Sequence, residues 1–270
     1  MGQTRRSITN QAEITMSFEL ITIPCLSDNY AFLAHDATCA KTLLVDAPEA
    51  APISKALTEK GWRLTDVLLT HHHRDHVDGL EELLKSHPAR VIGAKADQHR
   101  LPALDDTVVE GDVITVGSNT GIVFDVSGHT IGHIAVYFEQ SNLLFTADSL
   151  MALGCGRLFE GDAAQMWESL SKLKALDPDA SVCSGHEYTA ENGRFAITIE
   201  PKNSALQSRI LEITQKRSRN IPTVPSTLRQ ELETNPFLRP DSTEARYNLG
   251  MKTNTDAEVF AEIRRRKNNF

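Results

Sequence analysis

The segment from Thr70 to His76 limits more than any other what this chain can fold into. It reads Thr-His-His-His-Arg-Asp-His and continues a short apolar run, Val67–Thr70, that is typical of a buried strand. Its potential metal ligands are His71, His73, Asp75 and His76. In extended backbone, side chains two positions apart project to the same side, and a turn can then bring the last two ligands alongside them. The segment therefore predicts a loop at the end of a strand that holds two neighbouring metal sites.

Three later segments repeat this arrangement of a strand followed by a ligand. The ligands are His129, Asp148 and His186, and the strands before them are Ile122–Val126, Leu143–Phe145 and Ala180–Cys183. Because the ends of several strands can converge on one edge of packed sheets, we expect all these ligands to meet there. A surface cluster of histidines that binds metal adventitiously would not show this placement. Imidazole and carboxylate ligands suit Zn²⁺, Fe²⁺ or Mn²⁺ and leave room for a water ligand, so hydrolysis is the expected chemistry.

We expect none of the other histidines to bind metal, and a surface or structural role is favoured for each. They are His35, His72, His87, His99 and His133. Alternation along the chain points His72 away from its two neighbours. His133 is a candidate to support a metal ligand from behind.

Short β-rich runs separated by turn residues fill the chain from Phe18 to about Phe145. The predicted strands are Leu20–Ile23, Tyr30–Ala34, Thr42–Val45, Val67–Thr70, Val91–Ile92, Val113–Val116, Ile122–Val126, Ile134–Phe138 and Leu143–Phe145. Helical patterns interrupt them at Ala50–Lys60, which Gly61 stops, and at Asp78–Ser86. Because these strands exceed the needs of one short sheet, we expect an α/β (α+β) fold in which two sheets pack face to face with helices outside.

The character of the sequence changes after Asp148. A helix is predicted from an N-cap at Asp162 to Leu176, followed by the strand Ala180–Cys183. Strand signals largely vanish beyond about Thr189. The helical patterns there cover Asn203–Arg217, Ser226–Glu233 and Thr255–Lys267. We therefore expect a disordered leader over residues 1–16, a catalytic domain over 17–189 and a helical substrate-binding domain over 190–270.

Composition narrows the range of partners. Lys and Arg total 28 against 36 Asp and Glu, a formal charge of −8, which argues against broad contact with nucleic acid or anionic membranes. A small anionic substrate fits this charge where positive charge is local. The four cysteines show no C-x-x-C pair or disulfide-like spacing, and no apolar stretch approaches the ~18 residues of a membrane span. We expect a cytoplasmic protein with a small-molecule substrate and no obligate protein partner.

Several segments carry a resemblance to a known family. T-H-H-H-R-D-H at 70–76, G-H-T at 128–130, F-T-A-D-S-L at 145–150 and S-G-H-E-Y-T at 184–189 resemble the metallo-β-lactamase superfamily. Within it, the chain resembles glyoxalase II, the hydroxyacylglutathione hydrolases, through G-C-G-R-L-F-E-G at 154–161, N-P-F-L-R at 235–239 and R-R-R-K at 264–267. The resemblance spans roughly Phe18 to the C-terminus. It implies a four-layer αββα sandwich followed by a small α-helical C-terminal domain.

The resemblance also implies how the ligands divide between two divalent ions, which would be zinc, with iron or manganese as alternatives. His71, His73 and His129 would hold one metal, Asp75, His76 and His186 the other, and Asp148 would bridge them. Asp75 and Asp148 would serve as ligands that position a hydroxide.

The same resemblance implies substrate contacts by Arg157, Phe159, Tyr188, Arg264 and Lys267. The last two are three positions apart on a predicted helix, so they share a face and could bind the carboxylates of glutathione. The alternative is that these cations merely complement the helix dipole. Phe159 stands where the family often has tyrosine, so a hydroxyl that could bond the glutathione backbone would be missing there.

The expected activity is hydrolysis of S-D-lactoylglutathione and other S-2-hydroxyacylglutathiones by a metal-bridging hydroxide. The products would be glutathione and a 2-hydroxy acid, D-lactate, in the second step of methylglyoxal detoxification. Two alternatives stay open. One is a mononuclear iron enzyme of the same fold that resembles persulfide dioxygenases, and the other is a non-catalytic metal-binding protein.

Overall fold

The computed structural model describes residues 18–270, so the leader expected at residues 1–16 lies outside the described residues. The first of two six-stranded sheets has the order β1-β2-β3-β4-β5-β6, which is also their order along the chain. Its strands are β1 (Glu19–Cys25), β2 (Asn29–Asp36), β3 (Lys41–Val45), β4 (Asp66–Leu69), β5 (Arg90–Ala94) and β6 (Asp106–Val108). β1 to β3 pair antiparallel and β3 to β6 parallel, so the carboxyl ends of β3, β4 and β5 meet at one edge of the sheet.

The second sheet has the order β14-β13-β10-β9-β8-β7. Its strands are β7 (Val113–Val116), β8 (Asn119–Asp125), β9 (Ile134–Phe138), β10 (Leu143–Ala147), β13 (Ser181–Ser184) and β14 (Ser226–Thr227). Only the pairing of β10 with β13 is parallel. A small hairpin of β11 (Leu150–Met151) and β12 (Gly154–Cys155) follows β10 directly.

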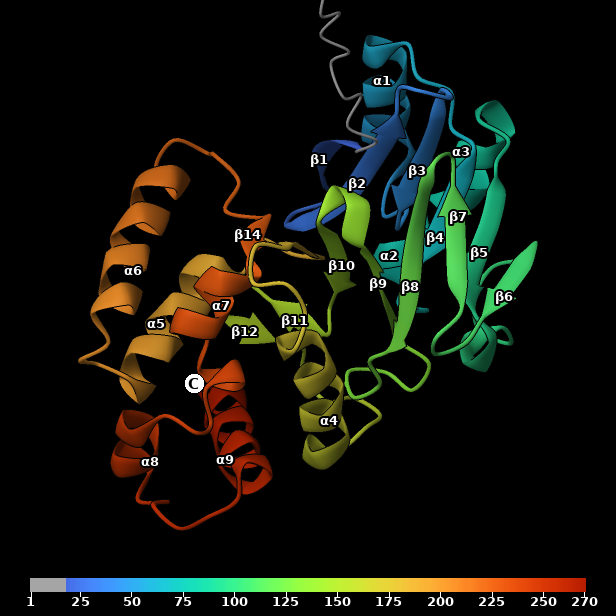
Figure 1. The fold of residues 1–270 in the computed structure, drawn as a ribbon. Coiled ribbons are helices and arrows are strands. Elements are labelled where there is room, and N and C mark those ends of the chain that lie inside the picture. Colours follow the sequence, from blue (N-terminus) through green and yellow to red (C-terminus); the bar gives the residue numbers. More distant parts are fainter. Residues whose placement is uncertain (1–17) are drawn as a thin grey trace, which may run out of the picture.

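The two sheets pack face to face, with helices on both outer faces (Figure 1). Buried apolar side chains fill the space between the sheets, and the Phe32 and Phe145 rings, one from each sheet, lie 5.9 Å apart. On the outer side of the first sheet, α1 (Ala50–Lys60) and α3 (Leu80–Ser86) bury apolar faces that include Leu57. On the outer side of the second sheet, α4 (Ala163–Lys174) does the same. This is the expected αββα arrangement, since each sheet and each helix hides one apolar face.

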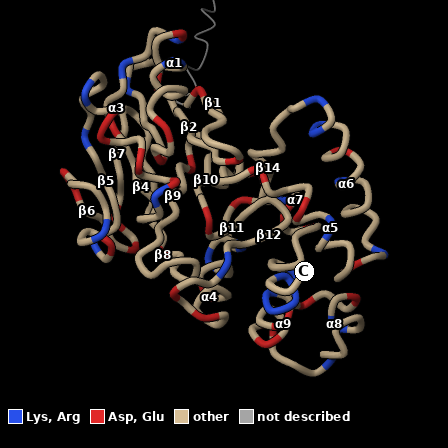
Figure 2. Tube along the Cα trace, turned by 180° about the vertical axis from the view of Figure 1, so that it is seen from behind, with Lys and Arg blue, Asp and Glu red and all other residues tan. Residues whose placement is uncertain are grey.

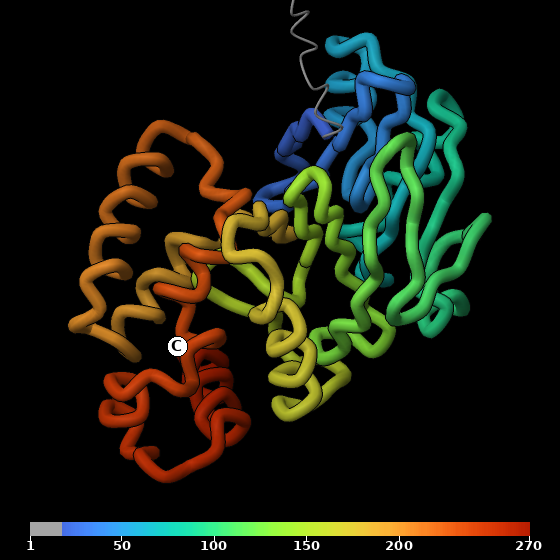
Figure 3. Tube along the Cα trace, viewed as in Figure 1, coloured from blue at the N-terminus to red at the C-terminus, as the bar shows by residue number. Residues whose placement is uncertain are grey.

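The last part of the chain is mainly helical and lies beside the second sheet (Figure 3, orange to red). Its helices are α5 (Thr189–Ile199), α6 (Ser204–Arg217), α7 (Leu228–Thr234), α8 (Thr243–Leu249) and α9 (Asp256–Asn268). The helix α9 packs on α4, where the Phe260 and Trp167 rings lie 5.8 Å apart. None of the described helices is long and apolar enough to cross a membrane.

The predicted helix ends are confirmed where a cap or a stop is visible in the sequence. Asp162 caps α4 by accepting a hydrogen bond from the backbone of Gln165, and Gly61 ends α1 in the left-handed conformation. The helix α4 stops at Lys174 rather than at Leu176.

The helix predicted at Asp78–Ser86 begins only at Leu80. Asp78 instead ends the short helix α2 (Arg74–Val77). Gly79 then packs so closely on the segment before α1 that a Cβ atom there would lie 2.7 Å from the backbone nitrogen of Glu49. The turn between α2 and α3 therefore depends on this contact.

Beyond Thr189 the described chain is mainly helical, as predicted, but the helix predicted at Ser226–Glu233 does not start at Ser226. Ser226 and Thr227, predicted as the start of a helix, form β14 and pair with β13. The helix α7 begins at Leu228 behind a capping box formed by Thr227 and Gln230. The helices α5 and α8 and the short strands β6, β11 and β12 were not predicted either. Each is short, and its pattern is too weak to stand out in the sequence.

Candidate metal centre

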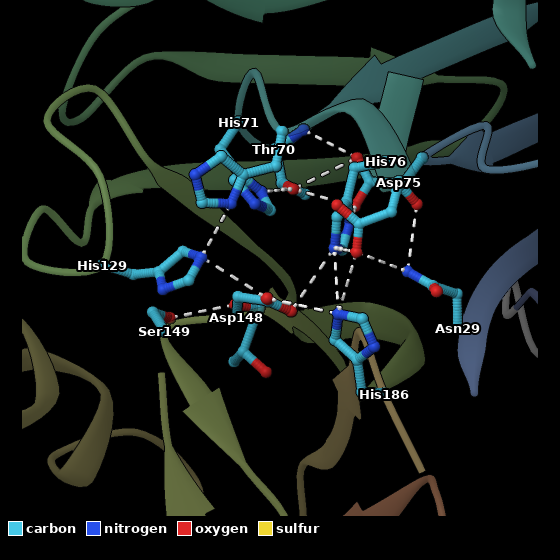
Figure 4. Close-up of polar contacts among 12 residues, drawn as sticks. Asn29, Thr70, His71, Asp75, His76, His129, Asp148, Ser149 and His186 are labelled. Carbon is cyan, nitrogen blue, oxygen red and sulfur yellow. Dashed lines mark hydrogen bonds and ion pairs between the residues drawn. The ribbon is translucent and has the colours of Figure 1, made fainter. Parts of the chain in front are cut away.

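The seven predicted ligands come together at one edge of the two sheets (Figure 4). The end of β4 supplies His71 and His73 in extended backbone, and α2 then turns Asp75 and His76 beside them. The other ligands follow the strands β8, β10 and β13. The parallel pairing of β10 with β13 carries both strand ends to the same place, because parallel strands end on the same side.

The first ligand group consists of His71, His73 and His129. One ring nitrogen from each lies within 4.8 Å of the other two. Nε2 of His129 is 3.0 Å from Nδ1 of His73. Nε2 of His71 is buried and has no hydrogen-bond partner among the described residues, which is unusual for a buried nitrogen unless it binds a ligand.

The second ligand group consists of Asp75, His76 and His186. Nε2 of His76 lies 3.3 Å from Nε2 of His186 and 3.9 Å from Oδ2 of Asp75. The same carboxylate oxygen is 3.5 Å from Nε2 of His186. The amide of Asn29 donates to this oxygen and so holds the Asp75 side chain in place.

Asp148 lies between the two groups. Its Oδ2 is 3.4 Å from Nε2 of His129 and 3.3 Å from Nε2 of His186. Its Oδ1, buried without a hydrogen-bond partner among residues 18–270, is 3.5 Å from Nε2 of His76. Donor atoms about 2.1 Å from one metal lie roughly 3.4 Å apart at tetrahedral angles. The donor set and its spacing therefore fit divalent metal ions, with Asp148 shared by both groups.

Outer partners fix the orientation of the ligand rings. Nδ1 of His129 donates to the carbonyl oxygen of Arg157 at 2.7 Å. Nδ1 of His76 donates to Asp46 at 2.7 Å, and Nδ1 of His186 donates to Asp28 at 2.9 Å. Each bond leaves Nε2 of the ring to face the other ligands, as is usual for histidines that bind metal.

The sequence analysis did not identify these outer carboxylates, although Asp46 carried a usable signal. It follows directly on β3, so it repeats the pattern of a strand followed by a ligand-type residue. Thr70 donates its backbone nitrogen to Oδ1 of Asp46 and its hydroxyl to Oδ2, the oxygen that also accepts from His76. The Thr70 hydroxyl in turn accepts from Nδ1 of His71 at 3.0 Å, so Asp46 supports both ligand groups.

The two groups differ in their electrostatics. Burial lowers the pKa of His73 to about 4 and, together with the neighbouring histidines, holds the pKa of His71 well below its usual value. Burial also acts on His76, but the carboxylates of Asp148 and Asp46 outweigh it and raise its pKa to about 9. The pKa of His186 is raised for the same reason, with Asp148 as the main partner.

The histidines without a predicted metal role lie outside both ligand groups. His72 points away and its Nδ1 donates to Asp97 at 2.9 Å. His133 lies behind the centre, where its ring stacks on His71 at 4.6 Å. Its Nε2 accepts from the backbone nitrogen of Asp148 at 3.3 Å. His133 thus contacts two ligands from the side away from the other donors.

A cavity of about 540 Å³ opens over the centre, and all five predicted substrate contacts line it. They are Arg157, Phe159, Tyr188, Arg264 and Lys267. Met151, Cys155, Gly156 and Asn192 line it as well. Cys155 and Gly156 belong to the motif at 154–161, whereas Met151 and Asn192 were not predicted. The ligands exposed in its wall come from both groups, so a bound molecule reaches the whole centre.

The two predicted cations, Arg264 and Lys267, both line this cavity from α9. Figure 2 shows Lys and Arg residues gathered on α9 near the chain end. Arg264 is only 5% exposed, and its Nη1 donates to the carbonyl oxygen of Cys155 at 2.9 Å. Lys267 lies over the rings of Phe195 and Phe270. Partial burial lowers the Lys267 pKa. Arg264 thus contacts the cavity wall, while Lys267 is the more accessible charge.

Sequence comparisons identify the family. The family model of the metallo-β-lactamase superfamily matches residues 29–186, and that of the hydroxyacylglutathione hydrolase C-terminus matches residues 187–270. A hydroxyacylglutathione hydrolase of Cereibacter sphaeroides is 58% identical over 255 residues, which make up 94% of this chain and 100% of that protein. One of Ruegeria pomeroyi matches with the same identity and coverage.

The chain belongs to the hydroxyacylglutathione hydrolase family.

Solved structures extend the likeness in fold beyond this family. The B3 metallo-β-lactamase BLEG-1 has a TM-score of 0.64 at 20% identity, covering 82% of this chain and 100% of its own. ETHE1 from Myxococcus xanthus has a TM-score of 0.64 at 22% identity, covering 93% of this chain and 90% of its own. The predicted superfamily, with an αββα sandwich and a helical C-terminal part, is confirmed.

Within this hydroxyacylglutathione hydrolase family member, each ligand group has an aromatic neighbour in the cavity. The ring of Tyr188 stacks on His186 at 4.6 Å. Phe159 meets His73 and His129 edge to face, at 5.6 and 5.3 Å. Its ring is 61% exposed, so it forms open cavity wall rather than core.

Proposed function

We propose that this chain hydrolyses S-D-lactoylglutathione and other S-2-hydroxyacylglutathiones to glutathione and a 2-hydroxy acid, the second step of methylglyoxal detoxification. One observation carries the proposal: Asp148 lies between the two ligand groups, and the cavity over them is also lined by Arg157, Arg264 and Lys267. The curated relatives at 58% identity are named for this hydrolysis. The substrate would place its thioester at the centre and its glutathione carboxylates near α9.

The proposed metals are two divalent ions, zinc or else iron or manganese. His71, His73 and His129 would hold one, Asp75, His76 and His186 the other, and Asp148 both. Bound there, the ions would supply a water of lowered pKa and stabilise negative charge that develops on the carbonyl oxygen. Hard and borderline cations of this kind suit a donor set of imidazoles and carboxylates.

The remaining chemistry falls to the protein's own side chains. Asp75 and Asp148 keep their carboxylates ionised and aimed at the centre. Burial tends to raise the pKa of Asp148, but His76 and His186 outweigh it and hold that pKa well below its usual value. The leaving thiolate has a conjugate acid of pKa about 8.5 by analogy with cysteine, so the reaction needs little help from a general acid.

We further propose that Lys267, Arg264, Arg157 and Tyr188 bind the glutathione part. Cationic side chains form strong hydrogen bonds with carboxylates, and these cations border the cavity in a chain that is acidic overall. The ring of Tyr188 lies against His186 and so faces the reacting end of a bound thioester.

Removal of metal tests the catalytic part of this proposal. A protein stripped by a chelator should lose thioesterase activity and regain it when a divalent ion is added back. Full activity in the metal-free protein would contradict the metal mechanism. Elemental analysis of the purified protein would identify the ions.

A Lys267→Ala variant tests the substrate. One charge-assisted hydrogen bond contributes about 1.5–3 kcal/mol, so KM for a glutathione thioester should rise at least about tenfold with little change in kcat. A short, uncharged thioester should show no such rise. Arg265→Ala is the matched control, because Arg265 lies on the same helix but is exposed and paired with Glu262. Equal effects on both substrates would contradict glutathione binding by Lys267.

The two alternatives lead to different results. A persulfide dioxygenase would consume oxygen with glutathione persulfide, and the names of the relatives at 58% identity do not favour it. A non-catalytic metal-binding protein would show the same thioester turnover before and after a His129→Ala change.

A further inference from the structure

The hairpin β11–β12 lies in the chain between two residues of the metal centre. These are Asp148, which lies between the two ligand groups, and Arg157, whose backbone binds His129 of the first group. The hairpin begins after Asp148 and ends just before Arg157, whose carbonyl oxygen accepts the Nδ1 hydrogen of His129. Gly156, at its end, donates from its backbone nitrogen to Ser149 O at 3.3 Å and so closes the loop on itself. The position of this hairpin therefore determines the positions of both Asp148 and the carbonyl group that orients His129.

Side chains from the C-terminal helices hold the backbone of this hairpin. The amide nitrogen of Asn235 donates to the carbonyl oxygens of Met151 at 3.0 Å and of Gly154 at 2.9 Å. A carboxylate oxygen of Glu231 accepts from the backbone nitrogen of Leu153 at 2.8 Å. The hairpin is two residues long on each side, so it has few hydrogen bonds of its own, and such a ribbon is not stable alone.

The two holding side chains are themselves fixed. Glu231 and Asn235 are fully buried, and the amide of Asn235 also donates to Glu231 at 3.1 Å. The guanidinium of Arg209 pairs with the other oxygen of Glu231, and the hydroxyl of Ser226 donates to it at 2.6 Å. A buried network in which each polar group has a partner is rigid, because any movement leaves one of these groups unpaired.

There is little room for the hairpin to move without disturbing the ligands. A Cβ atom on Gly156 would lie 2.1 Å from the carbonyl oxygen of Asp148 and 2.8 Å from Nδ1 of His129. Leu153, at the tip, takes a left-handed conformation with φ of 57°, which is costly for this residue type and needs support from its surroundings. The hydrogen bond from Leu153 to Glu231 is such a support.

We propose that Asn235 and Glu231 are positioning residues of the metal centre, which act through the hairpin β11–β12 to fix Asp148 and the carbonyl group that orients His129. This inference rests on the proposed metal centre. Asn235 and Glu231 lie about 80 positions beyond the hairpin in the sequence, in the part of the chain expected to bind substrate. The proposal gives them the additional role of supporting the metal ligands. Outer partners of metal ligands typically change metal affinity or activity by about 10–100-fold when they are lost.

An Asn235→Ala variant tests this role. Starting from the zinc-loaded protein, competition with a chelator should show at least about tenfold weaker zinc binding. With a glutathione thioester, kcat should fall while KM stays close to that of the parent, because the cations of α9 remain. Thermal unfolding of the metal-free protein separates this effect from loss of stability.

Asn248→Ala is the matched control. The Asn248 amide donates to the carbonyl oxygen of Ile199 at 2.9 Å, so this change removes an amide-to-carbonyl hydrogen bond from the same helical part without touching the hairpin. Zinc affinity and kcat in this variant should match the parent. If Asn235→Ala lowers the unfolding temperature like Asn248→Ala but keeps the zinc affinity and kcat of the parent, the proposal is wrong.

If Asn235→Ala does not fold, Asn235→Ser takes its place, because a water molecule next to the serine can satisfy the two carbonyl oxygens and so spare the fold. That water is not anchored to α7 as the amide is, so the hairpin should still be held less firmly and zinc affinity and kcat should still fall. Parental values for both would overturn the proposal. A parent protein that binds no divalent metal would instead overturn the proposed function itself.

Discussion

The two ligand groups are built at the same edge of the sheets but differ in charge. The first group has three histidines, and burial lowers the pKa of all three, which favours the neutral ring. The second group has a carboxylate of its own, and its histidines donate to further carboxylates, which favour the protonated ring. A metal entering the first group meets neutral nitrogens, whereas a metal entering the second must first displace a proton.

The difference arises from the outer partners rather than from the ligands alone. In the first group, His129 donates to a neutral backbone carbonyl group and His71 to the hydroxyl of Thr70. In the second, His76 and His186 donate to Asp46 and Asp28. Two sites that are both built from histidines can therefore have unequal affinities for the same ion, because a carboxylate partner raises the basicity of the ring.

Removal of the shared ligand should have the largest effect. Asp148→Ala takes a donor from both groups at once, so both metals should bind more weakly. Metal ions stabilise the transition state by several kcal/mol, and kcat/KM should fall about a thousandfold or more. Thioester turnover and metal content measure the two effects. Asp179→Ala, which removes an exposed carboxylate paired with Arg229, should leave both unchanged. Loss of metal from one group alone would show that Asp148 does not bridge.

Between pH 9 and pH 7, the metal affinity of the second group should fall about a hundredfold, while that of the first group should hardly change. The pKa of His76 is about 9 without metal, so as pH falls from 9 to 7 protons compete and affinity at the second group should drop about tenfold per pH unit. At the first group, where the pKa of His73 is about 4, affinity should stay nearly constant in this range.

Two variants isolate the groups for this measurement. His129→Ala leaves the second group intact, and His186→Ala leaves the first. Chelator competition from pH 7 to pH 9 on each variant gives the two slopes. Equal slopes would show that the charge difference between the groups has no effect on binding.

A change in one outer carboxylate should have a smaller effect, confined to one group. Asp28→Asn keeps an oxygen that accepts from His186 but removes its charge, so metal affinity at the second group should fall about tenfold. The first group should be unaffected. Ser27→Ala is a suitable control, since Ser27 is exposed and contacts only the outer oxygen of Asp28. An equal loss at both groups would mean that the outer partners do not act separately.

The smallest effect should come from the aromatic neighbours. Phe159→Tyr would give the first group a hydroxyl-bearing ring like that of Tyr188 beside the second. A single hydrogen bond contributes about 1 kcal/mol, so KM for a glutathione thioester should fall roughly fivefold. Stability should not change, because the ring is mostly exposed. An unchanged KM would show that the substrate does not reach this side of the cavity.

The proposed ligand positions were predicted because His129, Asp148 and His186 each come shortly after a run with strand character. The same rule also selects Asp46, which supports ligand residues from behind, so it narrows the candidates without choosing among them. The packing of parallel strand ends explains why these segments meet. The rule says nothing of which ring nitrogen faces the centre, since that depends on partners such as Asp28 that are distant in sequence. The division of ligands between the groups came from the family resemblance.

Contacts between distant segments could not be predicted. Ser226 and Thr227 are too few for an alternating pattern, and their pairing with β13 is decided by packing. The bond between Leu153 and Glu231 joins residues 78 positions apart, and in the sequence Glu231 reads as an ordinary polar residue of a helix. Burial of such a residue shows only when the chain is folded.

The hairpin contacts also fix the order in which the centre can be completed while the chain is being synthesised. The first ligand group is present once residue 129 has emerged from the ribosome, but the hairpin next to Asp148 lacks its partners until residues 231 and 235 have followed. A nascent or truncated chain that ends before them would carry every ligand and still hold Asp148 loosely. On the proposed role of Asn235 and Glu231, we expect metal to bind firmly only after this last part of the chain has been made.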